Sequence, residues 1–343
     1  HRTTTLRSFD MIRLDEFRPV SRLEVEATHL LQARIPVYDA HNHLGRPNQP
    51  EELVHDMDRY NIRRMVDLDG FWDGTFEEHI RRYREPYPER FRIFCRVDLT
   101  PIDEPDFATK ARDYVRRCSD MGASGIKFSK SLGLKLRDSS GALIPPDDDR
   151  LRPIWDAAAE HKLPVTIHIA DPPAFFEETT PENERYEELA THPQWSYVGK
   201  GCPDFDDLME CQHNLLRQNP DTTFIVAHVG SHAENLRAVA AMLDEYPNMV
   251  VDTAERISEL GRQPYSAREF LIRYQDRVLY GTDLIPNDTN VSCNYRFFET
   301  WDEYFPYNSW DEHNQGRWNI YGVGLPDDVL RKIYFDNAER IIG

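Results

Sequence analysis

The sequence predicts a (β/α)8 TIM barrel, and three observations support this fold class. Short apolar or β-branched runs alternate with longer amphipathic segments, which is the signal for parallel β-strands joined by helical crossovers. Eight such runs are present, and eight strands close this kind of barrel. The length of 343 residues exceeds the about 250 residues of a typical barrel, so the chain has room for insertions.

The eight predicted strands follow one another as repeating units. They are VYDAHNH (37–43), RMVDLDG (64–70), FRIFCRVDL (91–99), ASGIKFS (123–129), PVTIHIA (164–170), TTFIVAHVG (222–230), MVVDTA (249–254) and VLYGTDL (278–284). Most repeats take about 30 residues, the length of one βαβ unit. Between them, helical patterns such as DFATKARDYVRRCSDMG and AENLRAVAAMLDEYP end at a Gly and at a Pro, as helices commonly do.

Three long insertions interrupt this spacing, and each follows a predicted strand. The longest, residues 171–221, follows the fifth strand and is rich in proline, acidic and aromatic residues, so we predict a lid that shapes the substrate site. Residues 130–150 follow the fourth strand and residues 285–310 follow the eighth. Because barrel active sites lie at the carboxyl ends of the strands, all three insertions should surround one mouth.

The two ends of the chain complete this organisation. The first 33 residues form an N-terminal arm, in which SRLEVEATHLLQA predicts a helix. The final segment LPDDVLRKIYFDNAERIIG predicts a helix that closes the barrel. No internal repeat is visible, and we interpret residues 1–343 as one domain.

Composition excludes several classes of partner. The 41 Lys and Arg against 60 Asp and Glu give a net charge of −19, which would repel nucleic acids and acidic membrane surfaces. No apolar stretch approaches the roughly 20 residues that span a bilayer, and the first residues lack the apolar region of a signal peptide. The five scattered cysteines include no C-x-x-C pair, which is typical of free thiols in a reducing compartment. We therefore expect a cytoplasmic protein with a small-molecule substrate.

Histidine and aspartate side chains mark the carboxyl ends of the predicted strands. His41 and His43 stand two residues apart on the first strand, so they should share a face and could bind one ion. This pair alone is weak evidence, because a histidine is often only a buried polar residue with a partner. His168, His228 and Asp283 end the fifth, sixth and eighth strands, which places all five side chains at one mouth.

This arrangement resembles the amidohydrolase superfamily, whose pattern is H-x-H on strand one, His on strands five and six, and Asp on strand eight. The segments DAHNHLG, TIHIAD, IVAHVG and YGTD carry the resemblance, which is closest to the group that contains aminocarboxymuconate-semialdehyde decarboxylase. It implies a single divalent ion, usually Zn²⁺ with Mn²⁺ as an alternative, held by His41, His43, His168 and Asp283. His228 would then act as acid or base, and Asp283 could also accept a proton. No organic cofactor is implied.

Lys127, in the predicted fourth strand, leaves the number of ions open. Two-metal members of the superfamily carry a carboxylated lysine on strand four that bridges their ions, and Lys127 in GIKFS matches that position. In that arrangement His168 and His228 would hold the second ion. The alternatives are that Lys127 anchors a substrate carboxylate or forms a structural ion pair.

Four further residues are candidates for substrate binding. Arg256 follows the seventh strand and could bind a carboxylate through two hydrogen bonds, or could pair with a neighbouring acid. Trp72, Phe175 and Trp195 could line a pocket or simply pack in the core. The lysine and arginine candidates favour an anionic substrate.

We therefore interpret the chain as a hydrolase of a small anionic lactone, amide or cyclic ester, using a metal-activated water. The alternative is a lyase, because the resembled group includes decarboxylases and hydratases that use the same ion to stabilise carbanion or enolate character. A barrel that binds a ligand without turning it over, or that works without metal, is a third possibility. Related barrels often pair through arms like residues 1–33, so the resemblance also implies a homodimer.

Overall fold

A computed structural model describes residues 12–13, 16–17, 19–45, 49–307 and 315–343. Its centre is an eight-stranded sheet in which each strand pairs in parallel with the next one in sequence. The strands are β1 (Val37–Asp39), β2 (Ile62–Gly70), β3 (Phe91–Cys95), β4 (Gly125–Phe128), β5 (Val165–Ile167), β6 (Phe224–Val226), β7 (Met249–Asp252) and β8 (Val278–Leu279). Each one overlaps a predicted run.

Backbone hydrogen bonds bring the last strand back to the first. The amide of Ala40 donates to the carbonyl oxygen of Tyr280 at 2.9 Å, and the amide of Asp283 donates to that of His41 at 2.8 Å. These contacts join the segments that directly follow β1 and β8. The predicted (β/α)8 TIM barrel is therefore confirmed.

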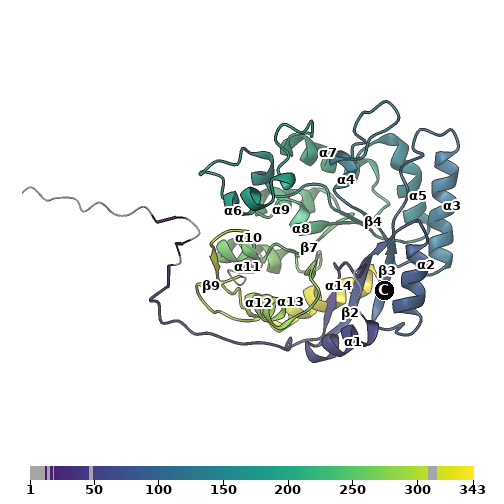
Figure 1. The fold of residues 1–343 in the computed structure, drawn as a ribbon. Coiled ribbons are helices and arrows are strands. Elements are labelled where there is room, and N and C mark those ends of the chain that lie inside the picture. Colours follow the sequence, from purple (N-terminus) through teal and green to yellow (C-terminus); the bar gives the residue numbers. More distant parts are fainter. Residues whose placement is uncertain (1–11, 14–15, 18, 46–48, 308–314) are drawn as a thin grey trace, which may run out of the picture.

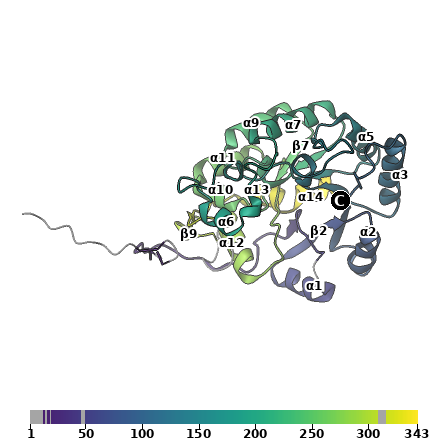
Figure 2. The same cartoon turned by 45° about the horizontal axis from the view of Figure 1, so that its top comes forward.

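Helices surround this sheet on the outside (Figures 1 and 2). The longer ones are α1 (Pro50–Arg59), α3 (Phe107–Asp120), α5 (Arg152–Glu160), α7 (Phe205–Gln218), α9 (Leu236–Glu245), α11 (Pro264–Arg273) and α12 (Asp288–Glu299). The shorter ones are α2 (Thr75–His79), α4 (Ser131–Leu134), α6 (Tyr186–Thr191), α8 (Ala227–Gly230) and α10 (Ile257–Arg262). Two short strands, β9 (Phe305–Pro306) and β10 (Asn319–Ile320), form a separate antiparallel pair.

The predicted closing helix is confirmed as a continuous helical segment. It consists of α13 (Asp327–Arg331), a π-helical stretch (Lys332–Asp336) and α14 (Asn337–Ile341). Another π-helical stretch, Ile80–Arg84, extends α2, and three short 3₁₀ turns lie at Asp149–Leu151, Pro173–Phe176 and Pro193–Trp195. Within the described residues, no helix is both long and apolar enough to cross a membrane.

The predicted helix in the N-terminal arm is wrong. Residues 21–33 have no helical structure, and Leu23 is 60% exposed. Asp302 holds this segment through hydrogen bonds from the Thr28 backbone amide at 2.6 Å and from the Thr28 hydroxyl at 2.9 Å. A short helix in water depends on packing an apolar face against other elements, and most of this segment is exposed instead.

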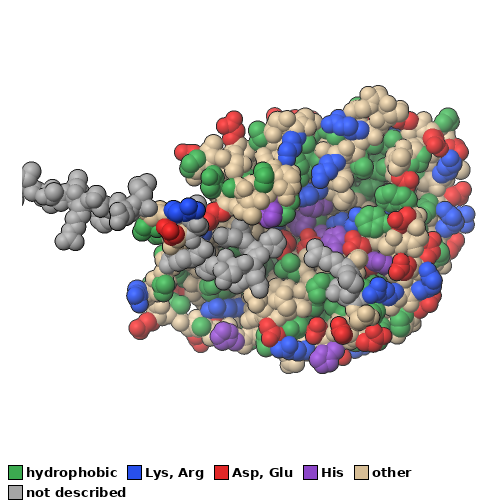
Figure 3. Space-filling model, in the orientation of Figure 1, with side chains coloured by type: hydrophobic (Ala, Val, Ile, Leu, Met, Phe, Trp, Pro, Cys, Tyr) green, Lys and Arg blue, Asp and Glu red, His purple; other side chains and the backbone are tan. Residues whose placement is uncertain are grey.

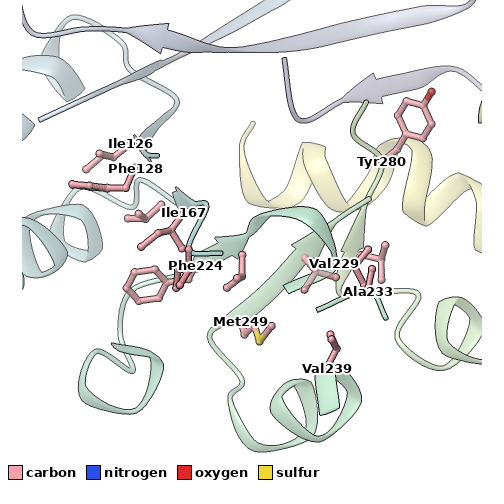
Figure 4. Packing of buried hydrophobic residues seen from close by; sticks show 14 of the residues in the cluster. Ile126, Phe128, Ile167, Phe224, Val229, Ala233, Val239, Met249 and Tyr280 are labelled. Atoms are coloured by element: carbon pink, nitrogen blue, oxygen red, sulfur yellow. The ribbon is translucent and has the colours of Figure 1, made fainter. Parts of the chain in front are cut away.

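Apolar side chains fill both sides of the sheet. The larger cluster lies between strands and helices, and Figure 4 shows part of it, including Ile126, Phe128, Ile167, Phe224 and Met249. A smaller cluster draws on alternate strand residues inside the barrel, namely Tyr38, Ala40, Val66, Leu68, Phe94, Ile225, Val250 and Leu279. The barrel interior is therefore packed, as in other barrels of this type, and leaves the strand ends for polar groups.

Candidate active site

His41, His43 and Asp283 lie just beyond the ends of β1 and β8. The sequence placed both histidines on the first strand, but β1 ends at Asp39, so they lie in the segment that follows it. They nevertheless point to the same place, because His41 Nε2 is 3.9 Å and His43 Nε2 is 3.6 Å from Asp283 carboxylate oxygens. Ligand atoms of His41, His228 and Asp283 all lie within 4.8 Å of one another.

In His41, His43 and His228, the Nδ1 atom of the ring lies within hydrogen-bond distance of an acceptor. His41 Nδ1 lies 2.8 Å from Asp252 Oδ2, and His43 Nδ1 lies 2.7 Å from Asp69 Oδ1. His228 Nδ1 lies 2.9 Å from the carbonyl oxygen of Ala254. A carboxylate or carbonyl can only accept, so each Nδ1 carries a hydrogen, and Nε2 is the ring nitrogen left to present a lone pair to an ion.

His168 lies beside the same group. Its Nδ1 lies 3.2 Å from His228 Nε2, and its Nε2 lies 3.3 Å from an Asp171 carboxylate oxygen. Burial lowers the pKa of His168 to about 4, and burial together with the neighbouring His168 and Arg256 side chains lowers the pKa of His228. His168 Nε2 makes no hydrogen bond with the described residues, so the neutral His168 ring can either donate from Nδ1 to His228 Nε2 or turn an Nδ1 lone pair toward a cation between the two rings.

The backbone is strained at several positions of this mouth. His228, Glu255 and Asp283 have φ values of 59°, 52° and 61°, in the left-handed region that non-glycine residues rarely adopt. Each costs on the order of 1 kcal/mol, and such residues concentrate at functional sites. The surrounding packing holds them there, and all three line one cavity.

Asp252, at the end of β7, ties three strand ends together. Its Oδ2 accepts from His41, while its Oδ1 accepts from the backbone amides of His228 at 2.9 Å and Ala254 at 3.1 Å. Burial acts to raise its pKa, but His41 and these hydrogen bonds outweigh it, so the pKa lies below its usual value. A single carboxylate thus orients the His41 ring and holds the backbone at His228.

Asp69 plays the corresponding part for His43. Its Oδ1 also receives a hydrogen bond from Arg96 Nη2 at 3.0 Å, and the Arg96 guanidinium lies over the Phe71 ring at 4.1 Å. Burial acts to raise the pKa of Asp69, but His43, Gly45 and Arg96 lower it to about 2. The carboxylate therefore remains charged and holds the His43 ring in place.

Sequence reasoning missed Asp171. Besides His168, its carboxylate contacts Lys130 Nζ at 2.5 Å and the Tyr197 hydroxyl at 2.7 Å. Burial acts to raise its pKa, but His168 and Lys130 hold it well below the usual range. Its position three residues after His168 at a strand end was a usable signal, whereas Tyr197, within residues 171–221, gave none.

A cavity of about 240 Å³ opens above the histidines. It is lined by Lys130, His168, Asp171, Pro172, Phe175, Arg185, Glu188, Trp195, His228, Glu255, Arg256, Asp283, Leu284 and Gln315. Figure 3 shows histidine side chains in a hollow on this face, with basic side chains beside them. Phe175, Trp195 and Arg256 thus line the cavity, whereas Trp72 is 43% exposed and lines a different cavity with Val97 and Phe107.

Three basic side chains face this cavity, and two of them have acidic partners. Lys130 pairs with Asp171, and Arg185 pairs with Glu188 and Glu259. Arg256 is 6% exposed and donates through Nη1 to the carbonyl oxygen of Glu255 at 2.7 Å. Among the described residues, no carboxylate lies within ion-pair distance of Arg256, so it can pair with a bound anion.

Lys127, on β4, lies against His41. Its side chain is 3% exposed, and Nζ lies 3.4 Å from His41 Nε2. Burial lowers its pKa to about 8 although Asp283 and Asp252 act to raise it. The structure therefore brings Lys127 to the same group, where it could bridge two ions as a carbamate or add positive charge beside one.

Comparisons with known proteins agree with this fold. Structures with similar folds include 2,6-dihydroxybenzoate decarboxylase from Rhizobium (15% identity, TM-score 0.52), covering 92% of this chain and 99% of that one. Another is 5-carboxyvanillate decarboxylase from Sphingomonas paucimobilis (14% identity, TM-score 0.54), where the match covers 91% of this chain and 99% of that one. A third is 4-oxalomesaconate hydratase from Rhodopseudomonas palustris (13% identity, TM-score 0.53), where the match covers 89% of this chain and 95% of that one. No curated protein sequence matches the chain.

A family model gives the assignment that these distant structures cannot give alone. The amidohydrolase model matches residues 26–343, which include every histidine and aspartate of the cluster. The resemblance seen in DAHNHLG, TIHIAD, IVAHVG and YGTD is thereby confirmed over nearly the whole chain. The chain belongs to the amidohydrolase family.

Proposed function

We propose that this protein is a metal-dependent lyase that removes CO₂ from a small anionic compound without an oxidant. One observation carries the metal dependence: ligand atoms of His41, His228 and Asp283 lie within 4.8 Å of one another. His43 Nε2 lies 3.6 Å from Asp283, and His168 Nδ1 lies 3.2 Å from His228 Nε2, so both rings adjoin this group. Imidazole and carboxylate donors suit Zn²⁺, and Mn²⁺ is the alternative. The ion would be held by His41, His43, His168 and Asp283. When bound, it would act as a Lewis acid toward negative charge on the substrate.

The cavity supports a small anionic substrate. Its volume of about 240 Å³ suits a compact molecule, and Arg256 is the cavity arginine without an acidic partner within the described residues. Arg256 would bind a substrate carboxylate, while Phe175 and Trp195 would contact the apolar part of the molecule. Residues 171–221 contribute both aromatic side chains and would act as the lid.

Two features favour a lyase over a hydrolase. The similar structures named above are two decarboxylases and a hydratase. In addition, Lys127, Lys130 and Arg256 place positive charge around the cluster, which would stabilise electrons left on carbon when CO₂ departs. Hydrolysis of a lactone, amide or cyclic ester is the second candidate, because Asp283 lies beside the ring nitrogens and could accept a proton from water.

A cytoplasmic location and pairing of two chains through the N-terminal arm also remain proposals.

Metal analysis combined with product analysis tests the proposal. We expect bound divalent metal, and we expect His43→Ala to lose it while keeping the fold. His213→Ala is the matched control, because His213 lies on α7 and contacts Tyr246 rather than the cluster. A panel of carboxylated aromatics and lactones would then be assayed. Release of CO₂ supports the lyase, release of acid without CO₂ supports the hydrolase, and full activity of metal-free protein refutes metal dependence.

A further inference from the structure

Glu255 lies between two cavities at the mouth of the barrel. It follows β7 with a strained φ of 52°, and its side chain lines the 240 Å³ cavity together with Asp283. A second cavity of about 50 Å³ lies behind it, and Glu255, Leu284 and Gln315 line both cavities. The second cavity is also lined by polar side chains, namely Ser258, Thr282, Asn290, Asn294 and Tyr307. A polar space of this size can hold water.

Hydrogen bonds fix the orientation of the Glu255 carboxyl group. Gln315 Nε2 lies 2.7 Å from Glu255 Oε2. Ser258 Oγ lies 2.8 Å from both Gln315 Oε1 and Glu259 Oε2, so these side chains form one hydrogen-bonded chain that holds the Glu255 carboxyl group in place. Glu255 Oε1 has no hydrogen-bond partner among the described residues and is not sealed off from solvent, so it can face the cavity.

Decarboxylation needs a group that donates a proton to the substrate carbon, and the other groups that line the cavity are poorly suited to this role. His228 was expected to act as acid or base, but its Nδ1–H is held by Ala254 and its Nε2 presents a lone pair. Lys130 is paired with Asp171. Asp283 faces the imidazole nitrogens as a candidate ligand.

We propose that Glu255 is the proton donor of the reaction, an inference that rests on the proposed decarboxylation. The bond between the substrate carbon and its carboxylate breaks, CO₂ leaves, and the electron pair stays on the carbon. That carbon takes the proton of the Glu255 carboxyl group, which leaves Glu255 as a carboxylate. Glu255 regains a proton from water that reaches it through the 50 Å³ cavity.

The electrostatic surroundings of Glu255 agree with this role. Burial raises its pKa to about 7, and the charges of Asp283 and Glu259 act in the same direction. Arg256 and Arg185 act to lower it. A carboxyl group of this kind is partly protonated near neutral pH, which is the range in which a general acid works best.

The variant Glu255→Gln tests the proposal, with Glu234→Gln as the matched control. Glu234 is also a largely buried acid, with two carboxylate oxygens that lack partners, but it does not line the cavity. We expect Glu255→Gln to lower kcat by about 100-fold or more, with KM and bound metal unchanged. Glu255→Asp, which keeps an acid, should recover part of the loss, and Glu234→Gln should keep kcat.

A second measurement does not depend on turnover. Infrared difference spectra of the metal-free and metal-loaded protein between about pH 6 and pH 8 should contain a carboxylic acid band that Glu255→Gln removes and Glu234→Gln keeps. Wild-type kcat in a folded Glu255→Gln protein would overturn the proposal, as would a fall in kcat that Glu255→Asp does not relieve at all. If the wild type releases no CO₂, the decarboxylation itself is wrong, and that result is separate from the infrared signal of Glu255.

Discussion

Arg185 should stabilise the lid more than any exposed arginine stabilises the barrel surface. Its side chain is 1% exposed and pairs with Glu188 at 2.8 Å and with Glu259. Glu188 lies in residues 171–221, whereas Glu259 lies on α10, so the guanidinium joins the lid to the barrel. It also lies 5.6 Å from the ring centroid of Phe175. Removing it would leave the buried Glu188 carboxylate without its cation and, among the described residues, Glu259 with only the cation of Arg262, at 3.8 Å.

The expected cost of Arg185→Met follows from this burial. Removing one partner of a buried ion pair typically costs about 3–5 kcal/mol, because the remaining charge stays buried and uncompensated. For 343 residues, an unfolding entropy of about 2.1 cal/mol/K per residue gives about 0.7 kcal/mol/K in total. The melting temperature should therefore fall by about 4–7 °C.

The matched control is Arg273→Met. Arg273 pairs with Asp244 at 2.6 Å, but both side chains are more than half exposed, so the loss should be below about 1 kcal/mol. Thermal and urea unfolding of both variants, followed by circular dichroism, would measure the difference. The double variant Arg185→Met with Glu259→Gln should recover part of the lost stability. If Arg185→Met is no less stable than Arg273→Met, the reasoning from burial is refuted.

Two further predictions concern the side chains around the histidines. Burial lowers the pKa of Lys127 from 10.5 to about 8. Between pH 8 and pH 10.5 the unfolded chain therefore binds more protons than the folded protein, and the destabilisation caused by Lys127 decreases as the pH rises through this range. Metal-free Lys127→Met should therefore be more stable than the wild type by up to about 3 kcal/mol near pH 7. Urea unfolding should find that this gain in stability is lost near pH 10.5. An equal gain at both pH values would contradict the prediction. Asp252→Asn should weaken metal binding by about 10- to 100-fold in chelator competition, because Asp252 orients His41 and the backbone at His228. Unchanged affinity would contradict that positioning role.

Several features of the site could be read from the sequence because strand ends converge in a closed barrel. Each polar residue that ends an apolar run had to reach the carboxyl face, since the interior is filled by alternate strand side chains such as Val66 and Ile225. His41, His228 and Asp283 were identified in this way, and the structure brings their ligand atoms together. The local pattern of each strand was sufficient for this step.

Other features depend on contacts between residues far apart in the chain. Asp252 contacts His41 across 211 positions, and Arg185 contacts Glu259 across 74 positions. No local periodicity encodes such pairs, so the sequence alone did not link Arg185 to Glu259. The N-terminal arm shows the reverse case, because SRLEVEATHLLQA has a helical pattern but is largely exposed, without the buried face that a helix needs.

The sequence by itself therefore determined the barrel, the order of its strands and the candidate ligands, because apolar periodicity and strand ends are local properties. Only the tertiary structure decided which ring nitrogen of His43 and of His228 is left for an ion, because that depends on the acceptors Asp69 and Ala254, which come from other repeats of the barrel. It also decided that Glu255 lies between two cavities and that Trp72 lies outside the candidate site. These features depend on how loops from different repeats pack against one another, which no single stretch of sequence specifies.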